Sequence, residues 1–267
     1  MPIDPCLNLT DLAELERLAQ RCTDSIAQCL EPGMTEEAVA SLMRQWLRQH
    51  GVSDALHRPL AWFGERTRLP ALPSRPSLTR LRPVYFPTSA KLEAGQAFTL
   101  YCAPRAGELV AEAVRCGSLG SHPGYQQLQL KVAHIKALLL QAVNQQQSLT
   151  ELTQLMEQLA QAQNASLCQS GIGGSWIRPY SSSPELGQNH QGLMEKVVDL
   201  TGNQAPAHLP DSPLHLSTDA PLTPGLWIIQ PWLDSGSLGA GMRALLYIAP
   251  QGKACWLNLP HTQTKAA

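Results

Sequence analysis

The pattern of apolar and polar positions predicts a pair of helices near the start of the chain. Between residues 11 and 30 the apolar residues recur at intervals of three and four, the spacing of an amphipathic helix. Asp11 and Glu14 are typical of a helix start, and Glu31-Pro32-Gly33 of its end. Thr35 then predicts the cap of a second helix. The first structural unit is therefore a helix pair.

The same order of elements returns later in the chain. A long helix from about residue 126 to 143 precedes a second helix that Ser148 can cap. Strands are predicted over residues 97–102 and 226–230, and each follows a turn that begins with leucine and ends with glycine. Residues 65–90, rich in Pro, Arg and Ser, predict a long surface connection.

This repetition predicts an internally duplicated α+β fold. The first half spans about residues 10–120 and the second about 121–257, joined about a pseudo-two-fold axis into one domain over residues 1–267. The helix pairs are expected to cover one face of an antiparallel sheet that the two halves share.

Composition excludes several classes of protein. The formal net charge of −1 comes without a cluster of Lys or Arg, so nucleic acid is not expected as a partner. No apolar run is long enough to cross a membrane, and the N-terminus lacks a signal-peptide pattern, which predicts a cytoplasmic protein. The seven cysteines show no CxxC pair or zinc spacing and are expected to be reduced.

Several short segments carry a resemblance to a known family. They are residues 92–101, 107–115, Ser170-Gly171-Ile172-Gly173, Ile177-Arg178-Pro179, 224–231 and the strand 244–248 that follows Arg243. In their order and spacing, over about residues 10–257, they resemble the M24 family of methionine aminopeptidases, Xaa-Pro peptidases and creatinase. The resemblance implies the pita-bread fold.

The resemblance also implies where a pair of metal ions would be held. The matched ligand positions are Tyr101, Glu112, Ser170, Gln230 and Arg243. A hard divalent pair needs several carboxylates and an imidazole, and only one carboxylate is left at these positions. A guanidinium cannot ligate a metal and repels one. We therefore expect no metal, no cofactor and no metal-dependent aminopeptidase activity.

Two interpretations of the altered site remain open. In the structural one, Glu112 and Arg243 form an ion pair that replaces the metal as the tie between the halves. In the functional one, Arg243 or Arg178, with Tyr101, Ser170 and Gln230, binds a carboxylate or a similar anion. Cys102 and Trp227 flank the expected pocket as further candidates for ligand binding.

The leading hypothesis is a non-peptidase that binds a small molecule, with an anion as one candidate, or a peptide or protein partner in the former active-site pocket. The alternative is a metal-independent, creatinase-like enzyme acting on a small amide or guanidino substrate. Against the alternative, residues 65–90 contain no histidine to serve as its general base. His57 is interpreted as a polar residue at the end of an element. A homodimer is compatible with the sequence.

Overall fold

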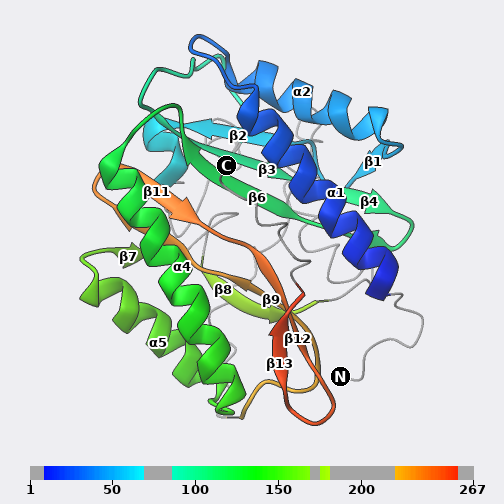
Figure 1. Ribbon diagram of the computed structural model, residues 1–267, viewed down its shortest axis with the longest axis vertical. Helices are drawn as coiled ribbons and strands as arrows, with labels where there is room; N and C mark the ends of the chain where they lie inside the picture. Colours follow the sequence, from blue (N-terminus) through cyan, green and yellow to red (C-terminus); the bar gives the residue numbers. More distant parts are fainter. Residues whose placement is uncertain (1–8, 69–85, 169–174, 181–219, 258–267) are drawn as a thin grey trace, which may run out of the picture.

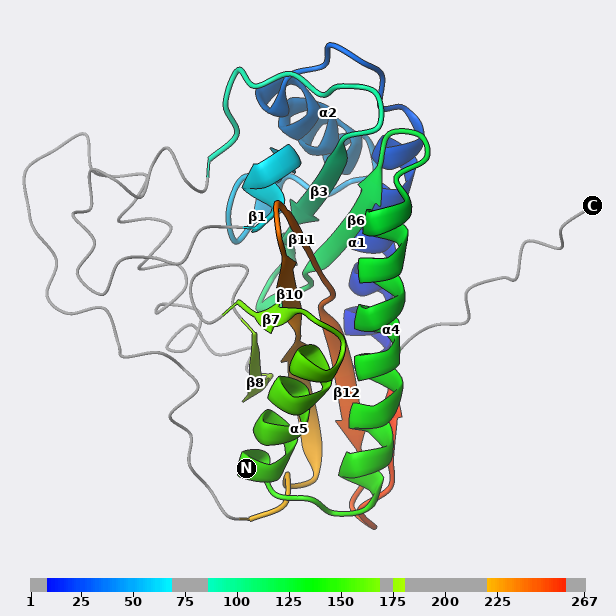
Figure 2. The same cartoon turned by 90° about the vertical axis from the view of Figure 1, so that its left-hand side faces the viewer.

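The computed structural model describes residues 9–68, 86–168, 175–180 and 220–257, and shows helices packed on antiparallel sheets (Figures 1 and 2). Helices α1 and α4 lie on the same face of the sheets in both views. Among the described residues, no helix is long and apolar enough to cross a membrane.

In the part of the first half that the structure describes, there are two helices, a short 3-10 helix and six strands. They are α1 (Leu9–Gln28), α2 (Glu36–Gln49), β1 (Asp54–Ala55), β2 (Leu60–Phe63), η1 (Gly64–Arg68), β3 (Ala97–Cys102), β4 (Pro104–Ala106), β5 (Leu109–Val110) and β6 (Ala113–Ser118). The strands pair in the orders β1-β4-β5 and β2-β3-β6.

The second half repeats this series. It consists of α4 (Pro123–Asn144), α5 (Leu149–Ala162), β7 (Ser166–Leu167), β8 (Trp176–Pro179), β9 (Gly225–Gln230), β10 (Trp232–Ser235), β11 (Leu238–Gly241), β12 (Ala244–Ile248) and β13 (Ala254–Trp256). Its pairing orders, β7-β10-β11 and β8-β9-β12-β13, match those of the first half with one added strand. The predicted duplication is therefore present in the strand pairing as well as in the element order.

The caps of the second helix in each half also match. Thr35 accepts a hydrogen bond from the Ala38 amide and forms an isolated β-bridge with Lys91. Ser148 makes a capping box with Glu151 and a bridge with Pro221. Both predicted caps are confirmed, and each is tied to the turn that feeds the long strand of its half.

Two expectations need correction. Helix α1 already includes Leu9, the first described residue, which packs beside Leu12, so Asp11 lies within the helix and not at its cap. The strands of the described residues pair in four hydrogen-bonded sheets, whereas one shared sheet was expected. The long strand β3 ends two residues before Pro104, and β9 ends directly before Pro231. Because proline has no N–H to donate to a ladder, the pairing changes at these points.

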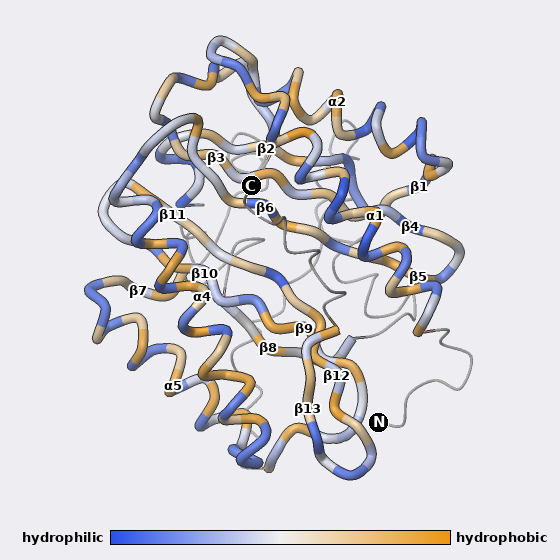
Figure 3. The backbone as a smooth tube through the Cα atoms, in the orientation of Figure 1, coloured by the Kyte–Doolittle hydropathy of each residue, from blue (hydrophilic) through white to orange (hydrophobic). Residues whose placement is uncertain are grey.

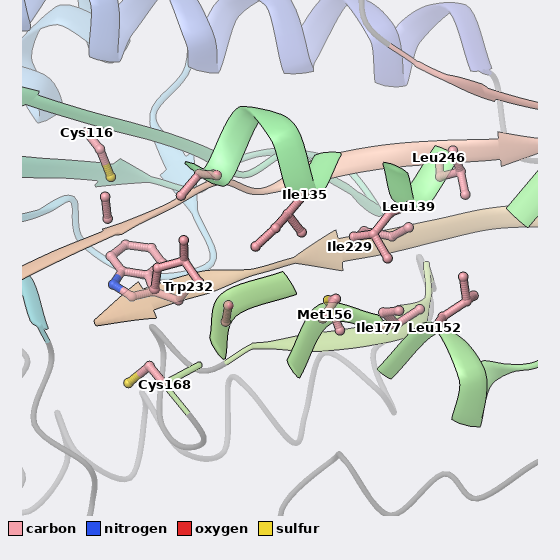
Figure 4. Close-up of a cluster of buried hydrophobic side chains, with 14 of the residues drawn as sticks. Cys116, Ile135, Leu139, Leu152, Met156, Cys168, Ile177, Ile229, Trp232 and Leu246 are labelled. Atoms are coloured by element: carbon pink, nitrogen blue, oxygen red, sulfur yellow. The ribbon is translucent and has the colours of Figure 1, made fainter. Parts of the chain in front are cut away.

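The apolar faces of the helices and strands form the core. Figure 3 shows polar and apolar residues alternating along the helices. In the second half, Ile135 and Leu139 of α4 and Met156 of α5 pack against strand residues such as Ile229 and Leu246 (Figure 4). A second cluster joins α1 and α2 to β3. Each long strand is thereby fixed beneath a helix pair.

A buried carboxylate anchors α2 in the first half. Glu36 is 0% exposed and accepts hydrogen bonds from the Phe63 amide at 2.9 Å and from Arg66 Nε at 2.8 Å. It also accepts from the amide and the hydroxyl of Thr88, at 2.9 and 2.8 Å. The start of α2, the end of β2 and the segment around residue 88 are thus held by one side chain.

The two halves meet at η1 and the β10-β11 hairpin. Thr67 Oγ1 accepts a hydrogen bond from the Gly239 amide at 3.1 Å, and the Thr67 carbonyl accepts one from Trp232 Nε1 at 3.1 Å. A Cβ on Gly239 would lie 2.2 Å from the Thr67 carbonyl oxygen, so only glycine fits there. Arg68 and Asp234 form a bidentate ion pair beside this contact.

Candidate functional site

Strand register places Tyr101 and Gln230 at equivalent positions in the two halves. Tyr101 pairs with Leu60, the first residue of β2, and Gln230 pairs with Trp176, the first residue of β8. Both therefore lie at the end of the central strand of their sheet. The duplication brings the two strand ends toward the same region of the molecule.

Four of the five matched ligand positions form one hydrogen-bonded cluster. The Tyr101 hydroxyl donates to Glu112 Oε2, and Arg243 Nη2 donates to Glu112 Oε1. Arg243 Nη1 donates to Gln230 Oε1 at 3.2 Å. Glu112 directly precedes β6 and Arg243 directly precedes β12, so the cluster connects the first half to the second.

The cluster is buried. The side chain of Arg243 is 4% exposed and that of Glu112 is 8% exposed. Tyr101 and Gln230 are buried as well. Taking either charge out of water alone would cost several kcal/mol, so each ion requires the other in this environment. The ion pair expected between Glu112 and Arg243 is present.

The other predicted residues are placed differently. Ser170 lies outside the described residues, and Arg178 is described only by its backbone, which pairs with Ile228 in β8-β9. Cys102 faces α1, where its thiol donates to the Ala19 carbonyl at 3.5 Å. Its hydrogen bond with Cys22 and its burial raise the pKa of the Cys102 thiol well above the usual range, which disfavours a nucleophilic thiolate.

Trp227 also belongs to the core. The residue is 9% exposed and packs in the large cluster around α4 and α5, with Nε1 donating to the Thr223 carbonyl at 2.9 Å. The indole N–H is therefore paired within the turn that precedes β9.

Glu16 is a member of the site that the sequence analysis missed. Its carboxylate Oε1 lies 3.3 Å from the Glu112 amide and accepts its hydrogen bond, and the side chain is buried. Burial raises the pKa of Glu16 to about 7, while the positive charge of Arg243 opposes the shift. Glu16 falls among Leu12, Leu15 and Ala19 on the apolar face of α1, and a carboxylate at such a position is a signal that could have identified it.

His57 also reaches this cluster. Its ring centroid lies 4.8 Å from that of Tyr101. Nδ1 lies 2.8 Å from the Arg58 carbonyl, and because a carbonyl only accepts, Nδ1 carries the hydrogen. Burial lowers the pKa of His57, which favours the neutral ring. Its Nε2 atom is buried with no hydrogen-bond partner among the described residues, so a buried acceptor is available beside Tyr101.

These residues do not fit a pair of metal ions. Both oxygens of Glu112 are engaged, one by Arg243 and one by Tyr101, and the guanidinium occupies space that a cation would need. In the part of the chain that the structure describes, no group of three or more His, Cys, Asp or Glu side chains could hold a metal ion. The donor set suits an internal ion pair.

Comparisons with known proteins place this site in context. The family model for metallopeptidase family M24 matches residues 11–200. Among solved structures, the chain is similar to an X-Pro aminopeptidase from Thermotoga maritima MSB8, with 14% identity and a TM-score of 0.63 over 95% of this chain and 62% of that one. A prolidase from Pyrococcus furiosus gives 13% identity and a TM-score of 0.61, covering 94% of this chain and 63% of that one.

A methionine aminopeptidase from Rickettsia prowazekii gives 10% identity and a TM-score of 0.59, covering 94% of this chain and 96% of that one. The chain thus spans somewhat less than two thirds of the length of the X-Pro aminopeptidase and the prolidase, and nearly all of this shorter enzyme. A search of curated protein sequences gives no significant match. The family model covers well over half of the sequence, and the neighbours share the pita-bread fold. The chain belongs to metallopeptidase family M24.

Proposed function

We propose that this chain is a non-peptidase member of the M24 family, in which a buried ion pair takes the place of the metal ions. We further propose that it binds a small molecule or a peptide or protein partner in the former active-site pocket. The observation that carries the proposal is the pairing of Arg243 with Glu112 at two positions where the family resemblance implies metal ligands.

Electrostatics supports the proposal that the ion pair takes the place of the metal ions. Two unit charges about 4 Å apart interact by about 4 kcal/mol at the effective dielectric of a protein near its surface. A divalent cation beside Arg243 would meet repulsion of at least this order, and it would also have to displace the guanidinium from Glu112. Gln230 offers only a neutral amide oxygen to such an ion.

The charge of the described cluster bears on the class of ligand. Glu112 neutralises Arg243, and Glu16 adds a carboxyl that ionises near neutral pH. The described residues therefore give the site no net positive charge. Of the candidate pocket residues named from the sequence, Arg178 is the one left to supply a preference for anions, so the anion hypothesis now depends on that side chain.

A second candidate function is favoured by His57. The alternative hypothesis requires a histidine base, and residues 65–90 contain none. His57 approaches from the segment between β1 and β2, with a neutral ring and an unpaired Nε2 acceptor beside Tyr101. Such a group can accept a proton. A metal-independent enzyme acting on a small amide or guanidino substrate thus remains the competing proposal.

Activity and ligand-binding assays separate these proposals. Peptides with N-terminal Met or Xaa-Pro should not be cleaved, with or without added Mn(II) or Co(II), and cleavage that depends on either metal would overturn the non-peptidase proposal. A thermal-shift screen of amino acids, keto acids, phosphates, amines and guanidines identifies ligands that bind the native state. Turnover of an amide or guanidine that is lost in His57→Ala, but not in the exposed control His50→Ala, would favour the enzyme.

A further inference from the structure

The outward face of α4 carries no formally charged side chain. Its exposed residues between the helix ends are Gln126, Gln127, Leu130, Ala133, His134, Ala137 and Gln141. At 100° per residue they fall within about 60° of Leu130 on either side, so they form one stripe along the helix. We call this set the α4 stripe. In Figure 2, α4 runs along the flank of the molecule, and the residues of the stripe are its solvent-exposed ones.

The duplication supplies an internal comparison for this stripe. Helix α1 occupies the matching place in the first half, and its exposed residues include Asp11, Glu14, Arg17 and Arg21. That composition is usual for a solvated helix face. The two helices bury their inner faces in the same way but differ outside, so the lack of charge on α4 does not follow from its role in the fold.

The two lysines of α4 do not contribute to the stripe. Lys131 Nζ donates to the Gln163 carbonyl at the end of α5, and Lys136 Nζ lies 5.1 Å from the ring centroid of Trp256 in β13. Both cations are held against their own chain, on the flanks of the helix. No like-charge repulsion from this face would oppose a second helix of the same sequence.

The stripe is also arranged symmetrically. Leu130 is 70% exposed, and among the described residues it is the only large apolar residue that is exposed to solvent. A two-fold axis between Ala133 and His134 that relates two antiparallel copies of α4 places Leu130 opposite Ala137. The same operation places Gln126 opposite Gln141. A large side chain thus meets a small one twice, and amides meet amides at both ends.

From this self-complementary pattern we propose that the α4 stripe is the contact surface of a homodimer, with two α4 helices crossing antiparallel about that axis. Such an isologous contact repeats every favourable interaction. The net charge of −1 per chain opposes association only weakly. The proposal is independent of what the former metal site binds.

The size of the contact sets the expected affinity. The 22 residues of α4 give a helix about 33 Å long, and a single helix pair of this length buries less than the roughly 1,200 Å² of a stable interface. Association is therefore expected to depend on concentration, with a dissociation constant in the micromolar range or above. Sedimentation at 1 to 200 μM protein covers that range.

Analytical ultracentrifugation of the full chain and of Leu130→Glu tests the surface. The substitution places two carboxylates in a contact without cations, and we expect the dissociation constant to rise about 100-fold or more. Gln45→Glu, on the exposed face of α2, adds the same charge elsewhere and should leave association unchanged. Circular dichroism and the melting temperature verify that each variant folds.

A pair of double variants tests the register. Gln126→Lys with Gln141→Glu puts opposite charges together in the antiparallel arrangement and should tighten association roughly fivefold. Gln126→Glu with Gln141→Glu should weaken it. If the first variant weakens the dimer, the antiparallel register is wrong. A monomer at 200 μM, or a dimer that Leu130→Glu does not affect, overturns the proposal and leaves the stripe to another partner or to solvent.

Discussion

Replacing Arg243 with alanine tests the cluster at its centre. The Arg243 and Glu112 side chains are 4% and 8% exposed, so the substitution leaves a buried carboxylate without its cation. Removing one partner of a buried ion pair costs about 3–5 kcal/mol. For a chain of this size, 1 kcal/mol corresponds to about 2–4 °C. The melting temperature of Arg243→Ala should therefore fall by roughly 6–20 °C.

Urea unfolding provides the free energy, and a matched variant provides the control. Arg115 pairs with Asp24, but their side chains are 54% and 42% exposed. An exposed pair contributes about 0–1 kcal/mol, so Arg115→Ala should change stability little. The double variant Glu112→Gln with Arg243→Met removes both charges and should lose much less than the sum of the two single substitutions.

Acidification gives an independent check of the mechanism. Without Arg243, burial should raise the pKa of Glu112 in the folded state. The penalty for the uncompensated charge should then shrink as the pH falls from 8 to 5, because Glu112 becomes neutral. A loss of less than 1 kcal/mol in Arg243→Ala at pH 8, or a loss no greater than that of Arg115→Ala, would refute the argument that the pair ties the halves together.

Two further predictions concern other buried carboxyls. Glu36→Gln removes the charge and an acceptor oxygen from a side chain that accepts four hydrogen bonds, and urea unfolding should show a loss of about 2–3 kcal/mol, against little change for the exposed neighbour Glu37→Gln. Equal losses in the two variants would contradict the anchoring role of Glu36. Because the pKa of Glu16 is raised from 4.5 to about 7, its contribution to stability is complete below about pH 4.5 and is lost as the pH rises through 7. The free energy of unfolding of the wild type should thus fall relative to Glu16→Gln by about 3 kcal/mol between pH 4.5 and 8; parallel pH profiles would show that Glu16 titrates normally.

Much of the fold followed from local patterns. Thr35 and Ser148 are caps because their hydroxyls can accept from the first turn, a property that depends on few other residues. The strand over residues 97–102 has the predicted bounds. The proximity of Glu112 and Arg243 came from the family resemblance, since no local pattern relates positions that lie 131 residues apart.

The missed residues depend on contacts between distant segments. His57 appeared to be a polar residue at the end of an element, and only the packing of residue 57 against β3 places its ring on Tyr101. Glu36 has the local pattern of an ordinary acidic residue in a first turn, although its carboxylate accepts hydrogen bonds from residues around 63 and 88. Glu16 did carry a signal, because a carboxylate on an apolar helix face requires a partner.

The metal content of the purified protein tests the central claim most directly. We predict well below one equivalent of Mn, Fe, Co or Zn per chain by elemental analysis, and no saturable heat on titration with Mn(II) or Co(II), because Arg243 already occupies Glu112. About two equivalents of such a metal per chain, retained through dialysis, would contradict the account and return the protein to the metal-dependent enzymes of its family.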